Sequence, residues 1–123
     1  MHALVVSLVA QGIAVPTLEC GGELTVSVGI VQPHEPVDVS IRLVNEGSAN
    51  WQNIRSVVSC PACVQVQSSP DLLEVGESGD IWIRLIPGSE SGPHLWSAAL
   101  VDADGVPTRM RIAGAVSGLR AAP

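Results

Sequence analysis

The sequence predicts an all-β fold, a sandwich of about seven to eight antiparallel strands, and three observations carry this prediction. Several stretches alternate apolar and polar residues, which is the period of a half-buried strand. The 12 Gly and 9 Pro are spread along the chain and leave no uninterrupted run for a long helix. The strand-like stretches recur about every eight to twelve residues, a spacing typical of sandwiches. A chain of 123 residues is the length of one domain, and its core must be aliphatic because Phe and Tyr are absent.

The first half of the chain contains a predicted strand, a turn and a second strand. The stretch 37–43 alternates Val, Ile and Leu with polar residues, so we expect a strand with one buried face. The Asn-Glu-Gly sequence at 45–47 predicts a turn. Residues 51–60 are expected to form the next strand, and residues 63–67 continue as a strand in which Val and Gln alternate.

The second half contains two further strand predictions. A loop, a short strand and a tight turn are expected over residues 68–80. The sequence IWIRL at 81–85 then alternates, with its Ile and Leu residues inward and Trp82 and Arg84 outward. The clearest hairpin lies within residues 95–116, where two apolar stretches flank Asp-Ala-Asp-Gly, a composition typical of tight turns.

The N-terminal residues 1–15 are apolar and have two interpretations. As a secretory signal peptide the stretch has a suitable apolar length, but no Lys or Arg precedes it. The sequence SLVAQGIAVP also matches MRIAGAVSG, which lies about one hundred residues further on, and this favours a strand equivalent to the end of a preceding module. We therefore expect an N-terminal strand in 1–15, a sandwich over 16–118 and a tail at 119–123. Val5 and Leu8 would then be contact residues of an exposed strand.

Short motifs follow one another in a recognisable order along nearly the whole chain. They are a Gly within a strand, Asn-x-Gly at a strand end, Ile-x-x-Val, a Cys motif, a Val-Gly turn and a final Gly-rich strand. The matching positions are Gly29, Asn45, Gly47, Ile54, Val57, Cys60, Gly76 and Gly114. This order resembles the bacterial DUF1573 domains and the wider ASH/MSP/Hydin-like set. The resemblance implies an immunoglobulin-like sandwich, frequently extracytoplasmic, often in arrays or fused to other parts, and without established catalysis.

Cys60 and Cys63 raise the main chemical question. The family's Cys-Gly-Cys-Thr has one residue between its cysteines and this chain has two, so the match ends at Cys60. A thioredoxin-type CxxC opens a helix, whereas the residues after Cys63 alternate as a strand. A zinc site needs four ligands, and only Cys20 and three widely spaced His remain, so Cys60 and Cys63 are weak metal candidates. The remaining interpretation is a disulfide or a pair of reduced thiols at the bend between two strands, with the disulfide expected in an oxidising compartment and with no metal or cofactor. Cys20 is then either buried or available to pair with another chain.

Charge and the remaining polar residues exclude several functions. The formal charge of −6, with six Arg and no Lys, argues against nucleic acid as a partner. No recognisable motif places a nucleophile near a histidine, so the chain is predicted not to be an enzyme. Asp102 and Asp104 are explained by turn chemistry. Trp51 and Trp96 are predicted core anchors, whereas Trp82 beside Arg84 has the composition of a protein contact.

These observations predict a non-enzymatic immunoglobulin-like module that binds protein. It would be a structural or accessory subunit of a larger bacterial assembly, with membrane contact at most indirect. The partner would be another protein or a neighbouring module, added by strand pairing, and a homo-oligomer is one form of this. The expected location is extracytoplasmic, with the cytoplasm as the alternative. The alternative function is a thiol-redox or metal-handling domain that uses Cys60 and Cys63.

Overall fold

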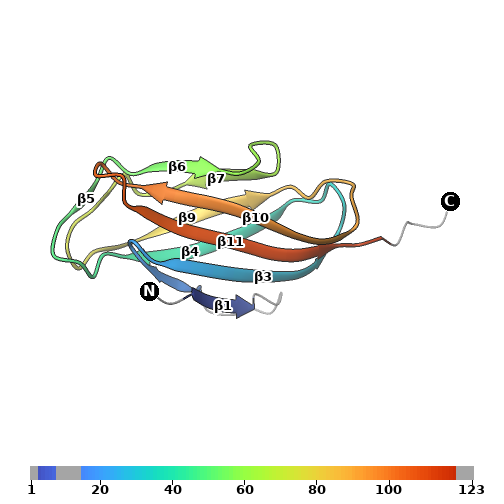
Figure 1. Cartoon of the computed structure of the whole chain (residues 1–123), viewed down its shortest axis with the longest axis horizontal. Helices are drawn as coiled ribbons and strands as arrows, with labels where there is room; N and C mark the ends of the chain where they lie inside the picture. The colour runs from blue at the N-terminus through green and yellow to red at the C-terminus, as the bar shows by residue number, and fades with distance from the viewer. Residues whose placement is uncertain (1–2, 8–14, 119–123) are drawn as a thin grey trace.

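The computed structural model describes residues 3–7 and 15–118, which form two β-sheets packed face to face (Figure 1). The described residues contain eleven strands: β1 (Ala3–Ser7), β2 (Thr17–Glu19), β3 (Glu23–Val31), β4 (Val37–Val44), β5 (Trp51–Gln52), β6 (Arg55–Val58), β7 (Val64–Ser68), β8 (Leu72–Leu73), β9 (Ser78–Leu85), β10 (Gly92–Val101) and β11 (Pro107–Val116). The predicted all-β sandwich is confirmed.

The five-stranded sheet has the order β1-β3-β11-β10-β6, and the four-stranded sheet has the order β2-β4-β9-β7. A two-stranded ribbon, β5-β8, lies at one end of the sandwich (Figure 1). The structure refines the expectation of seven to eight antiparallel strands in two respects. Short strands raise the number to eleven, and three pairings are parallel: β1 with β3, β3 with β11, and β2 with β4. Alternation within one strand carries no information on the direction of its neighbour.

The N-terminal segment contributes an edge strand to each sheet. β1 runs parallel to β3, with Ala3 opposite Glu23 and Ser7 opposite Ser27. β2 lies beside β4 in the other sheet. Val5 is therefore part of an edge strand and is paired with Thr25 through the backbone, whereas Leu8 lies outside the described residues. The domain boundaries given above stay a prediction.

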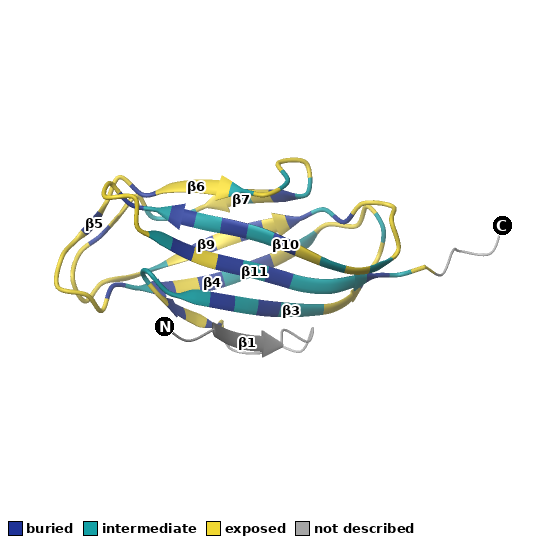
Figure 2. Ribbon diagram, viewed as in Figure 1, coloured by how far each residue is buried: buried dark blue, intermediate teal, exposed yellow. Residues whose placement is uncertain are grey.

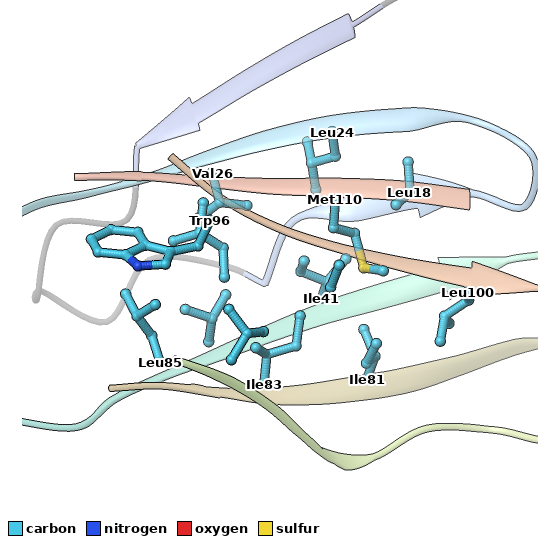
Figure 3. Packing of buried hydrophobic residues seen from close by; sticks show 14 of the residues in the cluster. Leu18, Leu24, Val26, Ile41, Ile81, Ile83, Leu85, Trp96, Leu100 and Met110 are labelled. Carbon is cyan, nitrogen blue, oxygen red and sulfur yellow. The ribbon is translucent and has the colours of Figure 1, made fainter. Parts of the chain in front are cut away.

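The core lies between the sheets and is almost entirely aliphatic (Figure 3). Ile81, Ile83 and Leu85 of β9 point into it, as their alternation predicts. Trp51 and Trp96 are buried, which confirms them as core anchors. The colours of Figure 2 alternate along β9, β10 and β11 because successive side chains point to opposite faces of a sheet.

Residues 51–60 do not form the single strand that we expect from the sequence. The strand is interrupted at Asn53, which has a φ of 52°. This is a left-handed conformation that Asn tolerates better than most residues. β5 before the break pairs with β8, and β6 after it pairs with β10 in the five-stranded sheet. In one continuous strand Trp51 and Ile54 would point to opposite faces. The interruption allows both side chains to be buried.

Two buried polar side chains hold the turns that the sequence predicts. The amide of Asn45 donates hydrogen bonds to the carbonyl oxygens of Ala49 and Leu73, both at 2.9 Å, and its Oδ1 accepts one from the amide of Gly47. In the β10–β11 hairpin, Oδ1 of Asp102 accepts hydrogen bonds from two backbone amides of the turn. Asp102 is thus explained by turn chemistry, as predicted.

Candidate functional site

Cys60 and Cys63 lie at the corner where the chain leaves β6 and enters β7. The two cysteines form a disulfide, with their Cα atoms 5.2 Å apart. The backbone amides of Cys63 and Val64 both donate to the carbonyl of Cys60 at 2.9 Å, so this bend is one tight turn and no helix follows it. The turn carries the chain from the edge of one sheet to the edge of the other. A bonded pair has no free thiolate to act as nucleophile or metal ligand.

Within the part of the chain that the structure describes, no group of three or more His, Cys, Asp or Glu residues is arranged so that it could hold a metal ion. The third cysteine, Cys20, is half-buried. Burial, assisted by the negative charge of Asp102, raises the pKa of the Cys20 thiol to about 11. His94 stacks on Trp96 with ring centroids 5.5 Å apart, and its Nε2 lies 2.8 Å from the carbonyl oxygen of Glu90. The burial of Cys20 and the stacking of His94 on Trp96 are both structural roles.

The corner joins two edge strands that differ in how well they are protected. β7 has an irregular register between Val66 and Ser68, a feature that discourages further strand pairing. β6 pairs regularly with β10 over four residues and contains neither proline nor bulge. The amide of Ser59 donates to the carbonyl of Ser97 at 3.0 Å. Because bonding directions alternate along an antiparallel strand, the backbone groups of Ser56 and Val58 point to the open side.

The outer face of the four-stranded sheet carries the predicted pair Trp82 and Arg84. Trp82 is 48% exposed, and the residues opposite it on the neighbouring strands are Ser40 and Ser68. Arg84 donates two hydrogen bonds to Asp38, at 2.9 and 3.3 Å. These bonds lower the pKa of the Asp38 carboxyl and raise that of the Arg84 guanidinium. Both residues lie on the outer face, as expected, but Arg84 is already engaged within the chain.

The outer face of the five-stranded sheet holds residues that sequence reasoning missed. Arg109 and Arg111 share one carboxylate, that of Glu23, at 3.5 and 3.6 Å. Val57 and Leu95 are both more than half exposed. One available signal was the alternation from Leu95 onward, which places this leucine outside because Trp96 is inside. Two arginines can share one carboxylate here only because β3 pairs with β11. No short stretch of the sequence predicts this pairing.

Comparison with known proteins identifies a fold rather than a family. No family model matches the sequence, and no curated protein matches it. A family 123 glycoside hydrolase from Clostridium perfringens is similar in structure over 77% of this chain and 23% of its own, with a TM-score of 0.61 and 12% identity. The secreted serine protease VesC from Vibrio cholerae is similar over 79% of this chain and 22% of its own, with a TM-score of 0.56 and 17% identity.

A single domain of a human protein is also among the similar structures. The ASH/PapD-like domain of human CEP192 (PapD-like domain 7) has a TM-score of 0.47 and 16% identity, over 78% of this chain and 82% of its own. The chain spans less than a quarter of the two enzymes, so their similarity concerns one part of each. At these identities the comparisons concern the fold alone, and the strand order shows that fold to be a β-sandwich. The described residues contain no helix long and apolar enough to cross a membrane.

Proposed function

We propose that this chain is a non-enzymatic binding module that pairs with a strand of another protein, as a structural or accessory subunit of a larger extracytoplasmic assembly. The observation that carries the proposal is the open edge of β6, which is regular and exposed and lies next to the disulfide corner. An added strand would satisfy the outward backbone groups of Ser56 and Val58. A disulfide favours an oxidising compartment, which supports an extracytoplasmic location. Membership of the DUF1573 family is part of the same proposal.

A proline at Ser56 tests this function selectively. Ser56→Pro removes an amide that points away from β10, so the fold should survive, whereas a strand can no longer pair along this edge. Ser56→Ala is the matched control because it keeps the amide. A photo-crosslinking side chain at the neighbouring Val57 reports contact, and the same side chain at Gly88, in the loop after β9, reports background.

The expected result is one discrete adduct at Val57 that persists with Ser56→Ala, disappears with Ser56→Pro and is absent at Gly88. The same adduct in all of these variants would contradict strand pairing at β6. Thermal unfolding of each variant establishes that a lost adduct does not reflect a lost fold.

A thiol-redox or metal-handling role for Cys60 and Cys63 is the alternative, and the half-exposed disulfide is the observation in its favour. This role requires a pair that cycles between dithiol and disulfide, or one that retains metal after reduction. Thiol titration over a series of redox potentials, with elemental analysis of the reduced protein, distinguishes the two functions. A binding module keeps its adduct at Val57 when both cysteines are replaced by alanine, whereas a redox domain loses its activity.

A further inference from the structure

We propose that the outer face of the five-stranded sheet is a docking site for the acidic segment at residues 71–77 of a second copy of this chain. This inference goes beyond the proposed function, because the contact uses the outer face of the sheet, whereas the proposed strand pairing uses the edge of β6. The contact joins two different patches, so it is head-to-tail.

The docking site is a depression above β6, β10 and β11 with a volume of about 330 Å³. It forms because the outward residues of β10, Ser97 and Ala99, are small, while larger side chains flank them on both sides. Val57 of β6 stands on one side and is 52% exposed. Arg109 and Arg111 of β11 stand on the other. We call this site the basic depression; β6, β10 and β11 lie side by side in Figure 1.

The charge of this face differs from that of the chain as a whole. The outward positions of β3, β6, β10 and β11 carry three arginines, Arg55, Arg109 and Arg111, and a single carboxylate, that of Glu23. Within the described residues no ion pair is found for Arg55. The face is therefore positive on a chain whose formal charge is −6. A partner that docks here should carry carboxylates around an apolar centre.

The segment Asp71–Glu77, which comprises β8 and the turn that follows it, has this composition. Leu72 and Val75 are 46% and 51% exposed, and Asp71 and Glu74 beside them are exposed acids. We call Asp71–Glu77 the acidic knob.

The acidic knob is held in a defined shape before any partner binds. The amide of Glu74 donates to Oε1 of Glu77 at 2.7 Å, and the amide of Val75 donates to Oδ1 of Asn50 at 3.0 Å. Because these bonds fix the backbone, little conformational entropy is lost on docking. The exposed valine at its tip matches the apolar floor of the basic depression in character, and its carboxylates match the arginines in charge. Each copy offers both patches, so docking propagates from copy to copy.

Two arginine substitutions test the inference on the full chain. Val75→Arg places a positive charge on the acidic knob, and Ala99→Arg fills the basic depression with a positive side chain. Each variant keeps the patch that the other has lost. Gln65→Arg, on the outer face of the four-stranded sheet, adds the same positive charge and is the matched control. Sedimentation equilibrium at low and high salt measures association, and thermal unfolding verifies each fold; Val57→Arg replaces Ala99→Arg if the latter fails to fold.

We expect the average mass of the unaltered chain to rise with concentration at low salt, without a plateau at the dimer, and to fall with added salt. Each arginine variant alone should associate at least about tenfold more weakly, a loss of about 1.4 kcal/mol. An equal mixture of the two should form dimers and nothing larger, because only one pair of intact patches remains. Gln65→Arg should associate like the unaltered chain.

An unaltered chain that stays monomeric up to about 500 µM, where even weak contacts of this class are populated, overturns the inference. Association that both arginine variants leave unchanged also overturns it, as does a mixture that forms no dimers. A monomeric chain that binds a different acidic protein at Val57 would contradict the second copy as partner while leaving the proposed function intact. Absence of an adduct at Val57 in the chain with Ser56 unaltered would instead contradict the proposed function.

Discussion

The two sheets present outer faces of opposite character. On the four-stranded sheet each arginine has a carboxylate of its own, Arg84 with Asp38 at 2.9 Å and Arg42 with Asp80 at 3.3 Å. On the five-stranded sheet Arg109 and Arg111 share the carboxylate of Glu23. One face is thus neutralised from within the chain, whereas the other retains positive charge. Arginines that are already paired are poorly suited to bind a partner, so the difference indicates which face is available for binding.

The largest expected effect is the difference in stability between substitutions on the inner and outer sides of one strand, β9. Ile83→Ala removes a fully buried side chain from the core and should lower the free energy of unfolding by about 2–5 kcal/mol. Trp82→Ala, one residue earlier and on the outer face, should change it by about 0.5 kcal/mol. Urea unfolding of both variants measures the difference. Similar losses in the two would show that Trp82 is part of the core packing and does not lie on an outer face.

An intermediate effect is expected when the carboxylate on each face is neutralised. Glu23→Gln frees two arginines beside the basic depression and should strengthen self-association by about threefold to tenfold at low salt. Asp38→Asn frees Arg84 on the other face and should leave self-association unchanged. Sedimentation equilibrium of the two variants, which carry the same change in net charge, compares the faces directly. Equal strengthening by both would mean that net charge, and not the basic depression, controls association.

The smallest effect concerns the pH dependence of the Asp38–Arg84 pair. Arg84 lowers the pKa of Asp38, so the stabilisation from this pair is present above the pKa that Asp38 has in the unfolded chain. It is lost as the pH falls through the lower pKa of the folded protein. The stabilities of the unaltered chain and of Asp38→Asn should therefore differ slightly at neutral pH and converge in acid. A difference that persists below this pKa would show that Asp38 contributes through something other than its charge.

The sequence predicts the inside of this molecule better than its outside. Alternation places Ile81, Ile83 and Leu85 correctly, because adjacent residues of a strand point to opposite faces and differ in polarity accordingly. Turn residues such as Asn45 and Asp102 are equally local signals. These parts of the fold need no knowledge of which strands are neighbours.

Features that depend on strand pairing could not be predicted from the sequence. The parallel neighbours of β3 and the split of residues 51–60 at Asn53 follow from contacts between segments far apart in the sequence. The same holds for the candidate site. Arg84 has the expected position, but its bond to Asp38 joins residues 46 positions apart. The basic depression forms only where β6, β10 and β11 lie side by side, so no single stretch of the sequence predicts it.

The central claim is that β6 is an open edge ready to accept a strand, and amide hydrogen exchange of the isolated chain under conditions that keep it monomeric tests it most directly. If the edge is open, the amides of Val57 and Ser59, which point toward β10, should be protected, whereas those of Ser56 and Val58 should exchange at close to the rate of an unstructured chain. Equal and strong protection of all four amides in the monomer would show that the edge is already covered, and would contradict the account.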